Sequence, residues 1–157
     1  MGEQNWFGCV IPEDLLYDLG RDVWVRRLEN GEVECGMTDV AQTRCGKIVT
    51  LQFRRVGRTV ERGHSLCTIE SAKWVGPFPA PLTGEIVAVN AEGFAEHPLM
   101  VNTDPYGAGW LVRLRPTRLE REWPDLLTGE AAQTAYAARI AELEVNCYRC
   151  AESEEAS

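Results

Sequence analysis

The chain has 157 residues, of which 45% are hydrophobic and 25% are charged, so it has the composition of a globular protein with a core of its own. Its 16 basic and 24 acidic residues leave a formal net charge of -8, which is the wrong sign for a protein that neutralises phosphates. We therefore expect neither a nucleic acid nor an anionic membrane as a partner.

The N-terminal residues lack the basic flank and the apolar run of a secretion signal. The uncharged stretch from Trp74 to Gly84 is interrupted by three prolines and is shorter than the ~20 apolar residues that span a bilayer. We therefore expect a cytoplasmic protein without a transmembrane helix.

Short strands separated by turn residues are predicted between Val23 and Arg115. Asn30-Gly31 is the clearest hairpin turn, because both residues tolerate the positive φ that a tight turn requires. The expected strands are Val23–Arg27, Glu32–Gly36, Ile48–Phe53, Ser65–Ile69, Glu85–Asn90 and Trp110–Leu114.

Two short helices are expected among these strands. The first covers Asp39–Cys45, with Asp39 as its N-cap, Gln42 at the capping-box position and Gly46 closing its end. The second covers Glu92–Glu96.

The longest helix is expected to begin after Thr128 and to run to about Val145. Its apolar residues fall on one stripe, which would dock the helix against the β domain; they are Ala132, Tyr136, Ile140 and Leu143.

These elements divide the chain into four parts. Residues 1–20 form an N-terminal extension, residues 21–116 a β domain, and residues 117–147 a C-terminal helical segment packed on that domain. Residues 148–157 form an acidic tail that we expect to be disordered, because it has almost no apolar surface to bury.

Most of the six cysteines are expected to be thiols, because the cytoplasm keeps cysteines reduced. Cys35, Cys45 and Cys67 are expected in the core. Cys147 and Cys150 form a C-x-x-C, and if the last helix continues past Val145 they extend its apolar stripe as packed thiols. A redox pair or a metal site remains the alternative for these two residues.

Arginine supplies fourteen of the sixteen basic residues, and the two lysines are Lys47 and Lys73. Codon bias is the simpler explanation for this preference of arginine over lysine. A lysine that is kept can also serve a reaction that a guanidinium cannot, such as formation of an amide or a Schiff base.

Lys73 lies between a β run that ends in Thr68-Ile69-Glu70-Ser71-Ala72 and a return stiffened by prolines. A second β run follows at Gly84. This order predicts a rigid hairpin whose tip presents one amine, while a solvated surface charge is the simpler role for the same residue.

Several ordered blocks carry a resemblance to the H protein family of the glycine cleavage system, over roughly Asp22 to Pro116. The blocks are Gly36–Gln42, Gly46–Val49, Val56–Val60, Glu70–Lys73, Thr83–Asn90 and Val101–Leu111. The resemblance implies a mostly β fold of the barrel-sandwich hybrid kind, a flattened lipoyl-domain-like barrel with short helices and a C-terminal helix.

The same resemblance implies a carrier and not an enzyme, with lipoic acid amide-linked to Lys73. Glu70, three residues before the lysine, and Gly84, in the opposite arm of the hairpin, match positions by which a lipoylating enzyme recognises this hairpin.

Two features depart from the usual H protein. The apolar segment Trp74–Pro79 follows the lysine, and Arg21-Asp22-Val23 stands where a His-Glu pair is typical. Three segments, the N-terminal extension Gly8–Tyr17, the segment Ala72–Pro77 around the lysine and the distal Leu127–Ala132, resemble lipoate-binding proteins associated with heterodisulfide-reductase-like sulfur oxidation.

That branch implies a carrier that shuttles sulfur-bound intermediates between enzymes of cytoplasmic sulfur oxidation, including thiosulfate oxidation. The implied partners are a heterodisulfide-reductase-like complex, a lipoate–protein ligase or other lipoate assembly enzyme, and dihydrolipoamide dehydrogenase.

Two other functions remain open. One is an ordinary H protein that carries the aminomethyl intermediate of glycine cleavage, and the other is an unmodified scaffold whose acidic C-terminal segment docks a partner. Cys9 is a candidate for sulfur exchange with a lipoyl disulfide, with a buried small apolar residue as the alternative.

Overall fold

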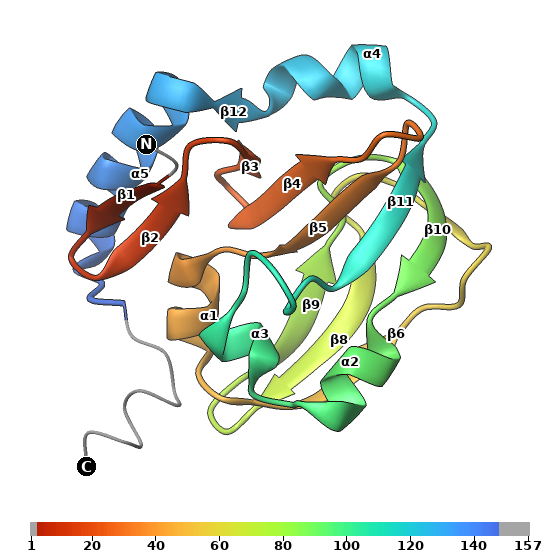
Figure 1. Ribbon diagram of the computed structural model, residues 1–157, viewed down its shortest axis with the longest axis horizontal. Coiled ribbons are helices and arrows are strands. Elements are labelled where there is room, and N and C mark those ends of the chain that lie inside the picture. The colour runs from red at the N-terminus through yellow and green to blue at the C-terminus, as the bar shows by residue number, and fades with distance from the viewer. Residues whose placement is uncertain (1–2, 148–157) are drawn as a thin grey trace.

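A computed structural model describes residues 3–147, in which antiparallel strands form three sheets (Figure 1). A three-stranded sheet places β8 (Ser65–Ser71) between β6 (Ile48–Phe53) and β9 (Val75–Pro79). β1 (Glu3–Trp6) and β2 (Cys9–Pro12) form a separate hairpin. The third sheet has seven strands in the order β12 (Leu127–Thr128), β3 (Leu16–Asp18), β4 (Val23–Arg27), β5 (Val33–Met37), β11 (Val112–Pro116), β10 (Gly84–Val89) and β7 (Thr59–Val60).

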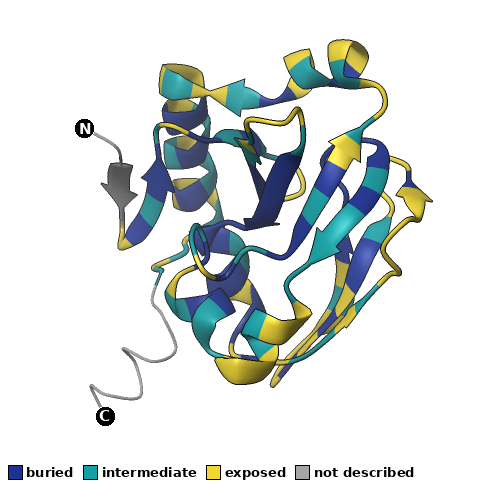
Figure 2. Cartoon of the chain, turned by 45° about the vertical axis from the view of Figure 1, so that its right-hand side comes forward, coloured by how far each residue is buried: buried dark blue, intermediate teal, exposed yellow. Residues whose placement is uncertain are grey.

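The seven-stranded and three-stranded sheets enclose the main hydrophobic core. Buried side chains from both sheets meet there, among them Val25, Leu114, Ile69 and Phe78. Figure 2 shows the resulting alternation, in which buried positions alternate with exposed ones along the strands at the rim. The expected class, a mostly β barrel-sandwich with short helices and a C-terminal helix, is confirmed.

Helices occupy the ends and one side of this barrel. Within residues 3–147, no helix combines the length and the apolar composition needed to cross a membrane. The α-helices are α1 (Asp39–Cys45), α2 (Ala91–Glu96), α3 (Met100–Thr103), α4 (Leu119–Glu122) and α5 (Gly129–Leu143), and a short 3-10 helix covers Trp123–Asp125.

A second core lies where the two ends of the chain meet. The rings of Tyr17 on β3 and Tyr136 on α5 pack edge to face, with their centroids 5.4 Å apart. Arg139 of α5 binds both carboxylate oxygens of Asp22 at 2.9 Å. The buried members of this cluster are Cys9, Ile11, Leu15, Tyr17, Trp24, Val40, Ala132, Tyr136 and Ile140.

The strongest predicted elements are confirmed with little change in their bounds. Val23–Arg27, Ile48–Phe53 and Asp39–Cys45 have the bounds that the sequence predicts. The other expected strands and Glu92–Glu96 are present with ends moved by one or two residues, as in β8, which continues to Ser71.

The helix caps differ in part from those expected. Thr38, and not Asp39, caps α1, because its hydroxyl accepts a hydrogen bond from the amide of Ala41 at 3.2 Å. Gly46 closes the helix as predicted, with φ 84°. The long helix ends at Leu143 and not at Val145, since Glu144 adopts the left-handed conformation.

The extension and the C-terminal segment are joined to the β domain more closely than the expected divisions suggest. β3, in the extension, pairs with both β4 and β12, so both ends of the chain add strands to the main sheet. Strands of two or three residues are too short to show a period in the sequence. The acidic tail, residues 148–157, lies outside the described residues.

Gly36 leaves room for the indole of Trp24, its partner in the β4–β5 ladder. A Cβ at Gly36 would lie 2.8 Å from the ring, and the ring is held by a 2.8 Å hydrogen bond from its Nε1 to the carbonyl of Pro105. Trp24 is fully buried. The close approach therefore requires glycine at this position.

We predict that Gly36→Ala lowers the free energy of unfolding by about 1–3 kcal/mol, because the core cannot accept the added methyl without displacing the indole. Urea denaturation measures this loss. Gly20→Ala is the matched control, since nothing lies within 4 Å of the added Cβ. Equal losses in the two variants would contradict the packing argument.

Candidate functional site

Lys73 lies in the tight turn between β8 and β9, and its side chain is exposed. The amide of Ser71 donates to the carbonyl of Trp74 at 2.8 Å and closes the turn. The amide of Lys73 in turn donates to the Ser71 hydroxyl at 3.3 Å. The predicted presentation of one amine at a hairpin tip is thus what the structure shows.

The Ser71 side chain ties this turn to the end of α1. Its hydroxyl, in a buried residue, donates to the carbonyl of Cys45 at 2.6 Å. The amide of Ala72 donates to the carbonyl of Lys47 at 3.2 Å. The position of the hairpin tip therefore depends on where α1 ends.

Gly46 gives the Lys73 side chain a path along the end of α1. A Cβ built on Gly46 would lie 2.9 Å from Cε and 3.4 Å from Cγ of Lys73. Gly46 also has φ 84°, which other residues adopt only with strain. The same glycine thus closes the helix and leaves space for the lysine stem.

Asn102 of α3 fixes the end of α1 from the other side. It is fully buried, and its amide nitrogen donates to the carbonyl of Gly46 at 2.9 Å and to Oε1 of Gln42 at 3.0 Å. Its amide oxygen accepts from the amide of Ile48 at 3.0 Å. This pattern satisfies a buried polar side chain and holds in place the segment on which the hairpin rests.

Both lysines of the chain lie at this site. Lys47 directly follows Gly46, is exposed, and accepts the amide of Ala72 through its backbone carbonyl. The sequence singled out Lys73 by its motif and gave no reason to place Lys47 beside it. The roles of Ser71 and Asn102 were likewise missed, although Ser71 stands inside the motif that identified Lys73.

Glu70 and Gly84, the two positions expected to guide a lipoylating enzyme, lie in different sheets. Glu70 is exposed on β8, three residues before Lys73, and is paired with Val75. Gly84 is buried and begins β10 in the other sheet, where it pairs with Val60 and Pro116. Gly84 therefore does not lie in the opposite arm of the hairpin, because β9 forms that arm.

The apolar segment Trp74–Pro79, expected as a return stiffened by prolines, consists of strand β9 and the residue before it. Trp74 and Val75 leave 41% and 64% of their surface exposed, whereas Phe78 is buried in the main core. The indole of Trp74 lies over Gly76, where a Cβ would be 2.2 Å from the ring. The segment thus presents apolar surface to solvent at Trp74, Val75 and Pro77, while Phe78 faces the core.

A pocket of about 360 Å³ opens beside Trp74, between α1 and the β8–β9 hairpin. Its apolar walls come from both sheets and from α1, and they include Met37, Cys45, Ile69 and Phe78. A pocket of this size with apolar walls suits a small ligand or a flexible arm.

Three charged residues line the same pocket: Arg21, Asp22 and Arg44. Both oxygens of Asp22 already bind Arg139, and Arg21 donates from Nη1 to Asp18 at 2.7 Å. Arg44 stands exposed in the last turn of α1. The charge that the pocket offers to a ligand is therefore positive.

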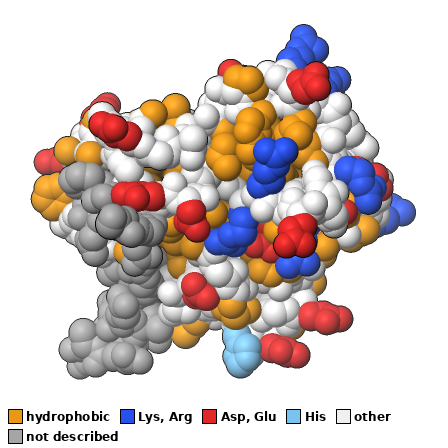
Figure 3. All heavy atoms as spheres, turned by 45° about the horizontal axis from the view of Figure 1, so that its top comes forward, with side chains coloured by type: hydrophobic (Ala, Val, Ile, Leu, Met, Phe, Trp, Pro, Cys, Tyr) orange, Lys and Arg blue, Asp and Glu red, His pale blue; other side chains and the backbone are white. Residues whose placement is uncertain are grey.

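Arginines elsewhere stack on aromatic rings. The guanidinium of Arg113 lies 4.2 Å from the centroid of Trp110, and Arg26 and Arg27 lie over Trp24 and Trp123. Figure 3 shows basic side chains lying over a patch of hydrophobic side chains on one face. Planar arginine suits this stacking better than lysine.

The cysteines differ from the expected thiols at two positions. Cys9 and Cys147 form a disulfide, with their Cα atoms 4.7 Å apart. Cys147 therefore does not extend the α5 stripe as a packed thiol, and Cys150 lies outside the described residues. The two partners are 138 residues apart, and no pattern in the sequence predicts such a pair.

Cys35, Cys45 and Cys67 are buried thiols that take part in no disulfide within residues 3–147, as predicted. Burial raises the pKa of the Cys67 thiol to about 12 and raises the pKa of Cys35 further. These two residues stay protonated near neutral pH and are poor nucleophiles.

Comparison with known proteins places the chain in a family. The family model described as "Glycine cleavage H-protein" matches residues 15–139. The chain therefore belongs to the glycine cleavage H-protein family.

Relatives with this name cover nearly the whole chain. The chain is 42% identical over 144 residues to "Glycine cleavage system H protein 2" of Aquifex aeolicus, which covers 92% of this chain and 89% of the relative. It is 43% identical over 143 residues to "Probable glycine cleavage system H protein 2" of Saccharolobus solfataricus. That match covers 90% of this chain and 95% of the relative.

A solved structure has the same fold. The glycine cleavage system H protein from Mycobacterium marinum matches with a TM-score of 0.65 and 32% identity, over 86% of this chain and all of that one.

We predict that Ser71→Ala destabilises the protein by about 1–3 kcal/mol, because the carbonyl of Cys45 loses its donor in a buried place. Amide hydrogen exchange at Ala72 and Lys73 should become faster at the same time. Ser65→Ala is the control: its hydroxyl donates to Cys67 within the same strand and does not contact α1. Unchanged exchange at the tip in Ser71→Ala would show that this contact does not hold the turn.

Proposed function

We propose that this chain is a lipoyl carrier protein that holds lipoate in amide linkage on Lys73. The single observation that carries the proposal is the exposed amine at a rigid hairpin tip, beside an apolar pocket, in a member of the H-protein family. A carrier of this kind is a substrate of its partner enzymes and is not itself a catalyst. We place it in the cytoplasm.

The residues around Lys73 fit such a group. Gly46 leaves the stem of the lysine a groove that a Cβ would fill, and Ser71 holds the turn so that the amine faces solvent. Trp74 and the pocket walls offer apolar surface to a hydrocarbon arm. When attached, lipoate supplies a disulfide that partner enzymes reduce to a dithiol.

A lipoyl carrier needs one enzyme that attaches the lipoate and another that reoxidises it. We propose that a lipoate–protein ligase or another lipoate assembly enzyme docks on the exposed tip, where Glu70 and Val75 flank the lysine. The buried position of Gly84 supports a part in shaping the barrel and not in touching that enzyme. Dihydrolipoamide dehydrogenase is the proposed partner that reoxidises the carrier.

The first candidate for the cargo is the aminomethyl group of glycine cleavage. It is supported by the names of the relatives, which are glycine cleavage system H proteins from bacteria and archaea.

The second candidate is a sulfur-bound cargo handed between enzymes of sulfur oxidation, with a heterodisulfide-reductase-like complex as the partner. It is supported by the charge of the pocket: Arg21 is already paired with Asp18, but the exposed guanidinium of Arg44 favours an anion, such as a sulfur oxoanion, over a protonated amine. Several numbered H proteins in one organism, numbers 2 and 3 in Aquifex aeolicus, are compatible with more than one carrier task.

We predict that a lipoate–protein ligase modifies the purified protein at Lys73 and that Lys73→Arg abolishes the modification, because a guanidinium does not accept the acyl group. Intact mass and peptide mapping detect the adduct. Lys47→Arg is the matched control, since Lys47 is exposed at the same site, and it should be modified like the wild type.

Modification at Lys47, or at neither lysine, would contradict the proposal. If neither lysine is modified, and the protein from its native host is also unmodified, the unmodified scaffold is favoured.

The two cargoes give opposite results with one enzyme. A glycine decarboxylase supplied with glycine should reduce the lipoylated protein if the cargo is an aminomethyl group, and thiol release measures the reduction. In that case Arg44→Gln should increase the rate several-fold, since removing a cation favours a cationic cargo.

For a sulfur-bound cargo, glycine should give no reduction. Cells carrying Lys73→Arg should then lose sulfur oxidation but keep growth on glycine. The control for Arg44→Gln in the glycine decarboxylase assay is Arg118→Gln. Arg118 is exposed and does not line the pocket, so its replacement removes one surface charge without changing the pocket.

A further inference from the structure

We propose that Cys9 and Cys147 form a redox-active pair, which small dithiols reduce through Cys147, and that its state controls how firmly the two ends of the chain hold α1. The disulfide joins the end of the β1–β2 turn to the segment that follows α5. Neither cysteine lines the pocket beside the β8–β9 hairpin that carries Lys73.

One sulfur of the pair is more open to attack than the other. Cys9 is fully buried, whereas Cys147 is partly exposed. A pocket of about 280 Å³ lies next to this segment, lined by Phe7, Val145 and Asn146 among others. A thiolate therefore reaches the Sγ of Cys147, and Cys9 is the leaving group.

The surroundings bring the two ends together independently of the S–S bond. The amide of Cys147 donates to the carbonyl of Phe7 at 3.0 Å. Gly8 has φ 79°, and a Cβ there would lie 2.6 Å from the carbonyl oxygen of Cys147. Only glycine allows this approach, so the reduced cysteines would remain close enough to re-form the bond.

The remaining cysteines among residues 3–147, which are not part of a disulfide, are less suited to this chemistry. Cys35, Cys45 and Cys67 are buried, and burial raises the pKa of Cys35 and Cys67 far above neutral pH. Among residues 3–147, exchange with an outside thiol is therefore directed to the Cys9–Cys147 pair.

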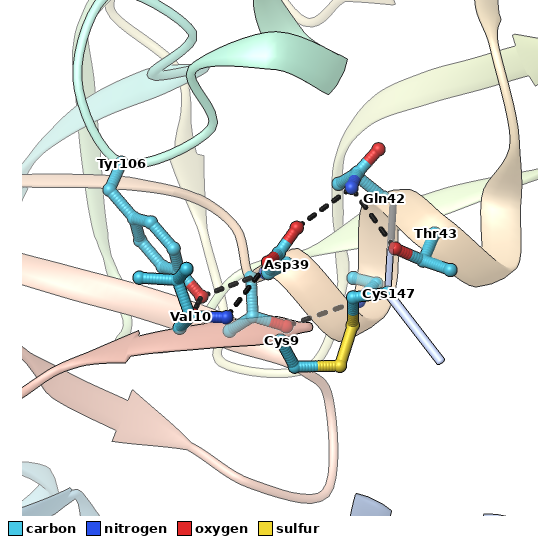
Figure 4. Close-up of a disulfide and its surroundings, with 9 residues drawn as sticks. Cys9, Val10, Asp39, Gln42, Thr43, Tyr106 and Cys147 are labelled. Carbon is cyan, nitrogen blue, oxygen red and sulfur yellow. Dashed lines mark hydrogen bonds between the residues drawn. A yellow bond between two sulfur atoms is a disulfide. The ribbon is translucent and has the colours of Figure 1, made fainter. Parts of the chain in front are cut away.

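Hydrogen bonds connect this pair to the first turn of α1 (Figure 4). The amide of Val10, next to Cys9, donates to Oδ2 of Asp39 at 2.8 Å. The hydroxyl of Tyr106 donates to the carbonyl of Val10 and accepts from the amide of Asp39. α1 begins at Asp39 and ends at Cys45, with Gly46 as its C-cap, and the stem of Lys73 lies against Gly46. The pair and the hairpin tip therefore contact opposite ends of one short helix.

The proposed exchange is balanced with a dithiol as the reductant. One thiolate of the dithiol attacks Sγ of Cys147, which forms a mixed disulfide and breaks the bond to Cys9. Cys9 leaves as a thiolate and takes up a proton. The second thiol of the dithiol then loses its proton and attacks its own mixed disulfide, so that the dithiol becomes a cyclic disulfide and Cys147 leaves as a thiol.

The test uses the full chain with Lys73→Arg, so that no attached arm takes part and the result is independent of the proposed function. Cys150 is replaced by serine, so that alkylation and peptide mass count the thiols of Cys9 and Cys147. Dihydrolipoamide is the dithiol probe, added to the air-oxidised, folded protein. We expect both cysteines to become alkylated without denaturant.

Amide hydrogen exchange then reports the structural effect. Reduction should speed exchange at Val10 and Cys147 by at least ~10-fold and at Gly46 by about 3-fold, while the β4–β5 ladder stays unchanged. The matched control is the Cys9→Ser/Cys147→Ser variant, whose exchange should match the reduced protein and should not respond to dihydrolipoamide.

Three results from the protein that keeps both cysteines would overturn the proposal. They are absence of the disulfide in the oxidised protein, a disulfide that dihydrolipoamide cannot reduce in the folded state, and equal exchange in the oxidised and reduced forms. A response of the double serine variant to dihydrolipoamide would also overturn it, because the effect would then arise elsewhere.

Discussion

The hydrogen bonds that join the end of α1 to the β8–β9 turn are the constraint on which the site depends. Ser71 binds the carbonyl of Cys45, and Asn102 binds the carbonyl of Gly46 and the amide of Ile48. Each of these groups is buried, so leaving one unpaired is costly. A seven-residue helix with little stability of its own is thereby fixed between a strand hairpin and α3, and the exposed Lys73 is held by a rigid base.

In this arrangement the backbone that carries Lys73 is fixed, and only the lysine side chain extends into solvent. The barrel and α1 fix the backbone of the tip, while the lysine stem passes over Gly46 and its amine stays in solvent. A carrier needs both properties, because an attached arm must reach several partners from one defined origin. The pocket beside Trp74 adds a place where the end of such an arm can lie, and the arginines at its edge make the charge of the cargo matter.

The sequence predicted the elements whose signals are local. Turn residues and alternation located β4 and β6, and Gly46 located the end of α1. The hairpin lysine was predicted because its motif is contiguous. Contacts between distant segments left no such signal. The pairing of β3 with β12 and the Cys9–Cys147 bond depend on packing of the two chain ends, and the hydrogen bonds of Asn102 join α3 to the end of α1. Gly84 was expected in the opposite arm of the hairpin because the segment that forms β9 was predicted as a return stiffened by prolines, and the strand beginning at Gly84 was predicted as that arm.

The most direct test of the central claim is the intact mass of the protein purified from its native host, with a peptide map that locates any adduct. The account predicts a lipoyl group on Lys73 and an unmodified Lys47. A bare Lys73 in every molecule, from cells that lipoylate their other carrier proteins, would contradict it.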